Sequence, residues 1–255
     1  MKPAPVAWRA AMLVIACVSF APGRDIVVIA HRGEHLRHAE NTLPAFQAAI
    51  DAGADFFECD VRTTSDGRLV LMHDRSVDRT TNGKGRISDL IFDQVRSLRA
   101  GASSVPTLEE ALRLAKGHIG VYVDYKEAAP NAVIAAIDSA DMGEHVVIYG
   151  DPDRLRQIFV SRPGWKIMPE AGNPARLSQL IAALHLRVAA FDAGDFQPAT
   201  IEIARKAGLD IYLDCLGPKD NEHGWSDALD RGATGIQSDH PAELIAFLRS
   251  KGLHK

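Results

Sequence analysis

Short apolar runs alternate with helix-length amphipathic segments along most of this chain. Apolar runs of four to six residues are typical of buried parallel strands, and apolar positions spaced three and four apart indicate helices that cover them. The predicted strands are 26–30, 56–61, 120–125, 145–149, 165–168, 188–192, 210–213 and 234–238. The predicted helices are 44–52, 108–116, 131–140, 153–160, 174–184, 200–206, 225–230 and 241–249. These strand-then-helix units predict an α/β fold, a closed (β/α)8 TIM barrel.

A doubly wound open sheet is the alternative fold. It usually carries a Gly-rich turn after its first strand, and His31-Arg32-Gly33 does not match that turn. Several predicted helices begin at residues that commonly cap helices. These signals are Thr42 before Pro44, Thr107 with Glu109 and Glu110, Asp151 before Pro152, and Asp239 ahead of Pro241.

Residues 63–106 interrupt the alternation, because they are too many for an ordinary strand-to-helix loop. Ser65-Asp66-Gly67 predicts a turn before a short strand at 69–72, and a helical stretch is predicted at 88–98. We therefore expect a small insertion after the second barrel strand, which returns His73 to the mouth of the barrel.

The composition is that of an ordinary globular protein, with 255 residues, 46% of them hydrophobic, and a net charge of -4. The mild acidity argues against a nucleic-acid partner. Cys59 and Cys215 lie in separate apolar runs, so we expect buried free thiols rather than a disulfide.

The first 21 residues have the pattern of an export signal. Lys2 and Arg9 precede the apolar run 10–18, and Ser19-Phe20-Ala21 offers a cleavage site. We expect residues 22–255 to form one exported domain, periplasmic or secreted, with a net charge of 27 minus 33, or -6, after cleavage. The alternatives are an uncleaved amphipathic helix, or a lipid on Cys17 that would tether the protein peripherally to a membrane.

Paired charged side chains mark the ends of two predicted strands. Glu58 and Asp60 are two residues apart, so they share one face of their strand, and Asp124 and Lys126 repeat this spacing. The oxygens of Glu58, Asp60 and Asp124 suit one hard divalent cation, Mg²⁺ or Ca²⁺. Strand ends collect at one rim of a barrel, where active sites lie.

Histidines complete this rim, because His31 and His73 each follow an apolar run. We expect them to act as general base and general acid, in an order that the sequence leaves open. Arg32 and Lys126 would bind a phosphoryl group. Glu170, Asp192 and Asp239 lie near strand ends and could line the mouth. The other histidines, among them His35, His38 and His240, are expected to be surface or packing residues.

These residues belong to motifs that resemble those of the glycerophosphodiester phosphodiesterases, in the same order, over roughly residues 26–250. The matching segments are His31-Arg32-Gly33, 39–46, 53–55, Glu58-x-Asp60-Val61, Thr64, Asp66-Gly67, His73-Asp74, Thr80, Gly83, Gly85, 105–110, Asp124-x-Lys126 and 232–241. The resemblance implies a (β/α)8 barrel with a small insertion after its second strand. It also implies metal-dependent hydrolysis of a glycerol phosphodiester to an alcohol and glycerol 3-phosphate.

The resemblance also assigns roles residue by residue. The matching positions are His31 and His73 for acid–base catalysis, Glu58, Asp60 and Asp124 for the metal, and Arg32 and Lys126 for the phosphate. In some members of the family the glycerol hydroxyl attacks the phosphorus first, which gives a cyclic phosphate.

Two positions depart from the family's pattern. The third metal position is usually Glu but is Asp124 here, as in the similar sphingomyelinase D-like phospholipases, and Asp214 stands where the family commonly has Trp. A carboxylate at position 214 would favour a hydroxyl-rich or cationic substrate. The alternative functions are a sphingomyelinase D-like or lysophospholipase D-type enzyme that releases a cyclic phosphate, and a weakly catalytic phosphodiester-binding protein.

Overall fold

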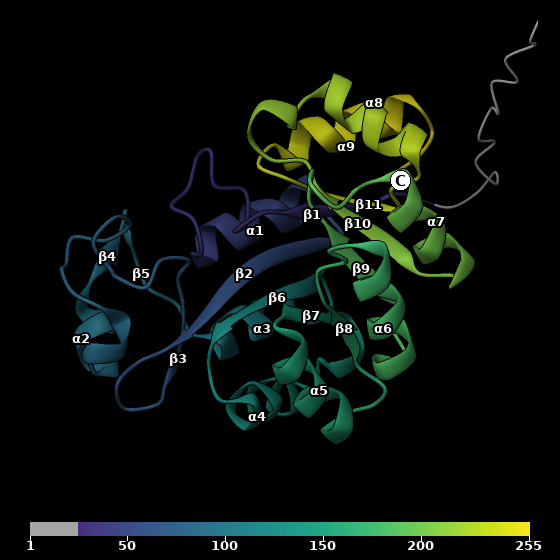
Figure 1. The fold of residues 1–255 in the computed structure, drawn as a ribbon. Coiled ribbons are helices and arrows are strands. Elements are labelled where there is room, and N and C mark those ends of the chain that lie inside the picture. Colours follow the sequence, from purple (N-terminus) through teal and green to yellow (C-terminus); the bar gives the residue numbers. More distant parts are fainter. Residues whose placement is uncertain (1–24) are drawn as a thin grey trace, which may run out of the picture.

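Eight parallel strands form the centre of the computed structural model, which describes residues 25–255 (Figure 1). In pairing order they are β8 (Lys166–Met168), β7 (Val146–Gly150), β6 (Gly120–Glu127), β2 (Phe56–Thr63), β1 (Val27–Ala30), β11 (Gly235–Ser238), β10 (Asp210–Asp214) and β9 (Val188–Phe191). The two ends of this order, β8 and β9, meet through Ala190 of β9. Its N–H donates to the Pro169 carbonyl oxygen at 3.2 Å, and its carbonyl oxygen accepts from the Ala171 N–H at 2.9 Å, so the ring is nearly closed. The predicted α/β barrel is confirmed, and the open sheet is wrong. The predicted export signal, residues 1–21, lies outside the described residues.

Helices follow the barrel strands and cover the outside of the ring (Figure 1). They are α1 (Leu43–Ala52), α3 (Leu108–Ala115), α4 (Pro130–Ala140), α5 (Pro152–Ser161), α6 (Pro174–Leu184), α7 (Pro198–Lys206), α8 (Glu222–Arg231) and α9 (Pro241–Ser250). The predicted caps at Thr107 and Asp151 are confirmed, since their side chains accept from the N–H of Glu110 and Asp153. The predicted cap at Asp239 is wrong: His240 occupies the N-cap of α9, and the Asp239 side chain bonds to His31.

The two-residue period of the strands divides their side chains between two apolar layers. Outward-facing residues, Cys59 among them, pack against the helices in one large core. The inside of the barrel is filled by a smaller cluster of Ile29, Tyr122, Val147, Met168, Val188, Ala190 and Tyr212. Cys59 and Cys215 are buried and free, as expected. Beyond the inner cluster, toward the carboxyl ends of the strands, the inward-facing positions are polar.

The segment between β2 and α3 leaves the barrel and forms a lobe at its side (Figure 1). It contains β3 (Leu69–Leu71), η1 (Ile87–Asp89), α2 (Phe92–Ser97), β4 (Arg99–Ala100) and β5 (Ser103–Ser104), around an apolar cluster of its own. The helix predicted at 88–98 is divided into η1 and the shorter α2. Strand β3 pairs antiparallel with the end of β2, and this pairing brings His73 back to the mouth. The remaining short turns are η2 (Gly143–His145) and η3 (Gly217–Lys219).

Within residues 25–255, no helix combines the length and the apolar character that crossing a bilayer requires.

Candidate active site

Three acidic side chains meet where β2 and β6 end. Register pairing sets Asp60 directly beside Asp124, and Glu58 lies two positions earlier on the same inward face of β2. Oxygens of all three carboxylates lie within 4.8 Å of one another. Burial, reinforced by the charges of Asp60 and Asp124, raises the pKa of Glu58 well above its usual value. Burial also raises the pKa of Asp124, to about 6.

Lys126 partly neutralises this group. Its Nζ lies 2.5 Å from Asp124 Oδ2 and 3.3 Å from Asp60 Oδ1. Burial by itself would lower the pKa of Lys126, but the two carboxylates outweigh it and raise that pKa. Lys126 and the guanidinium of Arg32, whose Nε lies 3.5 Å from Asp60 Oδ2, are two positive charges against three carboxylates, so negative charge remains in excess.

A divalent cation fits this set of donors. Mg²⁺ and Ca²⁺ take oxygen ligands at about 2.1 and 2.4 Å, so ligands on opposite sides of the ion are separated by about 4.2 to 4.8 Å. Oxygens of the three carboxylates lie within 4.8 Å of one another, close enough for one such ion to reach all three. Burial, reinforced by the charges of Asp60 and Asp124, raises the pKa of Glu58 and so disfavours its ionised form. A bound cation would favour that form. Glu58, Asp60 and Asp124 could therefore hold one divalent ion.

The loop after β1 fixes these carboxylates from the side. Asn41 donates from Nδ2 to Asp60 Oδ2 at 2.8 Å and accepts the Asp60 N–H at 3.0 Å, and the Arg32 N–H donates to Glu58 Oε2 at 2.8 Å. Arg32, Gly33 and Asn41 all have positive φ angles, between 54° and 82°. A side chain at Gly33 would also meet the Ala45 carbonyl carbon at 2.7 Å. The loop conformation thus depends on this glycine.

His31 is oriented by a carboxylate. Its Nδ1 donates to Asp239 Oδ1 at 2.6 Å, since the ionised carboxylate can only accept, and Nε2 therefore carries the free lone pair. Burial lowers the pKa of His31 below 6.5, although the hydrogen bond to Asp239 opposes this change. Asp239 is itself anchored through its N–H, which donates to Asp220 Oδ2 at 2.6 Å.

His73 is held in the same way from the other side. Its Nδ1 lies 2.8 Å from Asp74 Oδ1, and Arg62 donates to its carbonyl oxygen at 2.9 Å. Arg79 bonds to Asp74 at 2.7 Å and to Glu40 at 2.8 Å, and this hydrogen bond with Arg79 holds the pKa of Asp74 well below its usual range. Each predicted catalytic histidine thus has Nδ1 against an aspartate.

Arg32 does not point freely at solvent. Its Nη1 donates to Glu40 Oε1 at 3.1 Å, its Nε lies 3.5 Å from Asp60 Oδ2, and that buried Nε forms no hydrogen bond within residues 25–255. The guanidinium of Arg32 therefore lies between Glu40 and Asp60, at the edge of the group of three carboxylates.

More carboxyl groups line the opposite half of the mouth. Glu170 accepts from the Tyr149 hydroxyl at 2.8 Å, and Asp192 caps a turn by accepting the N–H of Gly194. Asp214 accepts from Gln237 at 3.0 Å, and burial beside Asp124 raises the pKa of Asp214 to about 7. The position that is commonly Trp in the family thus presents a carboxyl group at the mouth.

The seven predicted site residues lie around one mouth: His31, Arg32, Glu58, Asp60, His73, Asp124 and Lys126. Asn41, Asp74 and Asp239 hold these residues in place. Sequence reasoning assigned no role to Asn41 or Asp74, and it suggested for Asp239 a helix cap or a place at the mouth. Asn41 and Asp74 lie inside the sequence motifs 39–46 and His73-Asp74, and their place in those motifs could have indicated a role in the site. His35, which the sequence suggested is a surface or packing residue, contacts the His31 carbonyl oxygen and the Asp239 carboxylate.

Active sites of (β/α)8 barrels lie at the carboxyl ends of the strands, so the fold and this mouth together define a TIM-barrel enzyme. Residues 31–160 match the sequence profile of the glycerophosphoryl diester phosphodiesterase family. A glycerophosphodiester phosphodiesterase of Caldanaerobacter subterraneus subsp. tengcongensis is 31% identical over 254 residues, which cover 89% of this chain and 99% of the relative. The chain therefore belongs to the glycerophosphoryl diester phosphodiesterase family and is an enzyme of that family.

Solved structures agree with this assignment. The crystal structure of glycerophosphodiester phosphodiesterase from Agrobacterium tumefaciens is 29% identical and superposes with a TM-score of 0.75, covering 85% of this chain and 97% of the other. An Oleispira antarctica phosphodiesterase, solved with the product sn-glycerol-3-phosphate, has a TM-score of 0.78 over 88% of this chain and 97% of its own. At 21% identity the latter supports the fold alone.

The Asn41 contacts generate a prediction about cation affinity. Asn41→Ala removes both hydrogen bonds to Asp60, so Asp60 is free to rotate toward Lys126. We expect the affinity for Mg²⁺ or Ca²⁺ to fall about 10- to 100-fold, as is usual when a partner of a metal ligand is lost. Isothermal titration calorimetry measures this, with Gln47→Ala on the exposed face of α1 as control. Unchanged affinity in Asn41→Ala would contradict the assignment of Asp60.

The lowered pKa of His31 generates a prediction about pH. A general base works unprotonated, so kcat/KM should fall on the acid side with a midpoint below 6.5. Asp239→Asn removes a group that raises the pKa of His31, and it should move this midpoint to still lower pH. Steady-state kinetics between pH 4.5 and 9 test both statements. A midpoint that moves upward in Asp239→Asn would rule out the base role.

Proposed function

We propose that this enzyme hydrolyses glycerophosphodiesters to an alcohol and sn-glycerol 3-phosphate, with His31 and His73 as general base and general acid and with one divalent cation. The observation that carries the proposal is the pair of histidines, each held through Nδ1 by an aspartate, beside a buried group of three carboxylates. The relative from Caldanaerobacter subterraneus, which is named for this activity, supports it.

The cation is Mg²⁺ or Ca²⁺, and Glu58, Asp60 and Asp124 hold it. When bound, it supplies positive charge that stabilises the negative charge developing on the phosphoryl oxygens. Lys126 adds a second positive charge at the same place, because its ammonium already contacts two of the three carboxylates. Arg32 contributes donors to the phosphate from the loop after β1.

The proton transfers follow from the two imidazoles. His31 is the base, because burial favours its neutral form and its Nε2 lone pair is free. It accepts the proton of the attacking hydroxyl while the phosphorus–oxygen bond to the alcohol breaks. His73, whose Nδ1 bonds to Asp74, then donates a proton to the departing alcohol oxygen. If the glycerol hydroxyl attacks first, water opens the cyclic phosphate with the two roles exchanged.

The cleft beside the site favours a polar substrate. A cleft of about 590 Å³ begins at Asp124 and Lys126 and runs past Tyr149 to Arg154 and Arg176. Charged and hydroxyl-bearing side chains make up much of its wall, so it suits a small polar headgroup better than an acyl chain. Asp214 adds an acceptor for a hydroxyl or ammonium group. A deacylated glycerophosphodiester is therefore the preferred substrate, ahead of a lysophospholipid.

Residues 22–255 act outside the cytoplasm in this proposal. Its support is the sequence of residues 1–21, with a charged start, a short apolar run and a small-residue cleavage pattern. A chain that acts there would meet glycerophosphodiesters released from lipids.

The activity is tested with the purified full chain. We expect it to release glycerol 3-phosphate from glycerophosphoethanolamine, glycerophosphoglycerol and glycerophosphocholine, to lose this activity in EDTA and to regain it with added Mg²⁺ or Ca²⁺. His73→Asn should lower kcat about 10²- to 10⁴-fold, because the leaving alcohol would lose its proton donor. An enzyme-coupled assay for glycerol 3-phosphate measures both.

The control variant is His223→Asn, an exposed histidine on α8 that makes no contact with the site residues described above. Phosphorus NMR of the products separates hydrolysis from a reaction that ends at a cyclic phosphate. EDTA-resistant release, or full activity in His73→Asn, would contradict the proposal. Accumulation of a cyclic product alone would favour the sphingomyelinase D-like alternative.

A further inference from the structure

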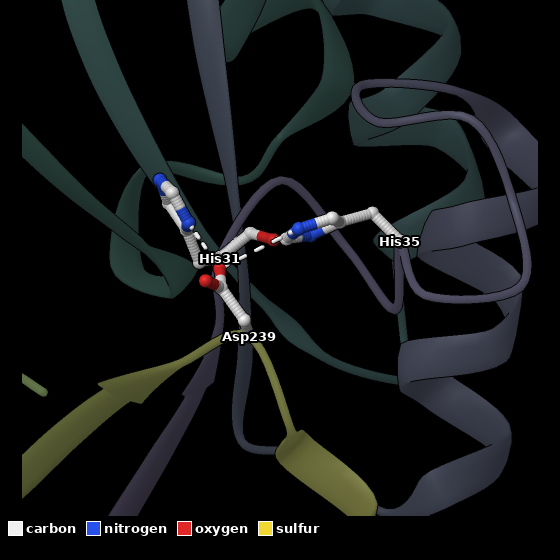
Figure 2. A group of neighbouring side chains, drawn as sticks. All are labelled: His31, His35 and Asp239. Atoms are coloured by element: carbon white, nitrogen blue, oxygen red, sulfur yellow. Dashed lines mark hydrogen bonds and ion pairs between the residues drawn. The ribbon is translucent and has the colours of Figure 1, made fainter. Parts of the chain in front are cut away.

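His35 lies in the loop between β1 and α1 and converges with His31 on a single carboxylate (Figure 2). Its Nδ1 lies 2.7 Å from the His31 carbonyl oxygen, and its Nε2 lies 3.5 Å from Asp239 Oδ1. The same Oδ1 atom accepts from His31 Nδ1 at 2.6 Å. The rings of His31 and His35 meet edge to face, with centroids 5.8 Å apart. One oxygen of Asp239 therefore faces both rings.

Elementary chemistry fixes the role of one His35 nitrogen. A carbonyl oxygen accepts but cannot donate, so His35 Nδ1 must carry the proton of its 2.7 Å hydrogen bond. The other ring nitrogen, Nε2, then faces Asp239 Oδ1 across 3.5 Å. The His35 ring therefore links the backbone of His31 to the side chain of Asp239.

A metal ion shared by the three residues is the competing interpretation, because His31, His35 and Asp239 form a possible ligand group. Tetrahedral Zn²⁺ with ligands at about 2.0 to 2.1 Å would keep neighbouring ligand atoms about 3.3 Å apart. The 2.6 Å between His31 Nδ1 and Asp239 Oδ1 is instead the length of a short charge-assisted hydrogen bond. The distances thus favour Asp239 Oδ1 as a hydrogen-bond acceptor rather than as a ligand of a shared metal.

We propose that His35 is a positioning residue for the reaction, which holds both the backbone of His31 and the Asp239 carboxylate that orients the His31 ring. This inference rests on the proposed role of His31 as general base. His35 touches neither the group of three carboxylates nor the phosphate-binding residues in the contacts described, so it acts through Asp239 and His31. Without it, Asp239 keeps its anchored N–H but loses one of two partners that fix its side chain.

Two amide variants separate the two contacts of His35. In His35→Asn the amide can take the place of Nδ1 and donate to the His31 carbonyl, whereas in His35→Gln the longer side chain can take the place of Nε2 and donate to Asp239. His35→Ala removes both contacts. His38→Ala, an exposed histidine on the same loop, is the matched control.

Steady-state kinetics on glycerophosphoethanolamine should show that His35→Ala lowers kcat about tenfold with KM within twofold, because a misplaced base slows the chemical step rather than binding. His35→Gln should recover most of the lost kcat, and His35→Asn should recover less. A kcat in His35→Ala within twofold of the unaltered enzyme would overturn the proposal. Equal losses in all three variants, accompanied by a lower unfolding temperature, would make His35 merely structural and would also overturn it.

A second readout does not depend on activity. Proton NMR should show a low-field resonance for the His31 Nδ1 proton, assigned by its loss in His31→Gln. We expect His35→Ala to shift or broaden this resonance, His35→Gln to restore it, and His38→Ala to leave it unchanged. A resonance that is unaffected in His35→Ala would contradict the proposal even if the enzyme proves inactive on glycerophosphodiesters. Failure of the proposed function and failure of the His35 inference are therefore distinguishable.

Discussion

The mouth of this barrel depends on one electrostatic constraint, the burial of three carboxylates side by side. The register of β2 and β6 places Asp60 next to Asp124, and Glu58 lies two positions before Asp60 on the same face. Like charges so close in a buried place raise the pKa of Glu58 and weaken the fold unless positive charge balances them. Lys126 and Arg32 balance part of this charge. The negative charge that remains would favour a cation at this end of the barrel.

The other features of the site fix groups around that centre. The loop after β1 delivers Asn41 and Arg32 to the carboxylates, and the lobe after β2 returns His73 to the mouth. Both histidines have the same arrangement, in which Nδ1 lies against an aspartate oxygen. In the proposed mechanism, an acid and a base held in this way would exchange protons without reorganising.

The sequence predicted the barrel, and it predicted a set of charged and histidine residues that the structure brings together, because both depend on local patterns. The alternation of apolar runs and amphipathic segments indicates the fold. The two-residue spacing of Glu58 and Asp60 indicates that both side chains lie on the same face of their strand. The partners of these residues were harder to predict. Asp239 lies 208 positions from His31, and only the pairing of β1 with β11 joins them, so its local pattern suggested a helix cap instead. His35 carries no pattern, because loop geometry alone determines its contacts.

Thermal unfolding of the full chain and of Glu58→Gln, with and without Mg²⁺ or Ca²⁺, tests the central claim most directly. Ionised Glu58 costs stability because its pKa is raised, so Glu58→Gln without cation should unfold at the same temperature as the unaltered chain or higher. Added cation should raise the unfolding temperature of the unaltered chain, because it binds only the folded state, and should hardly affect Glu58→Gln. A cation that leaves the unaltered chain unchanged, or that stabilises both equally, would contradict the account.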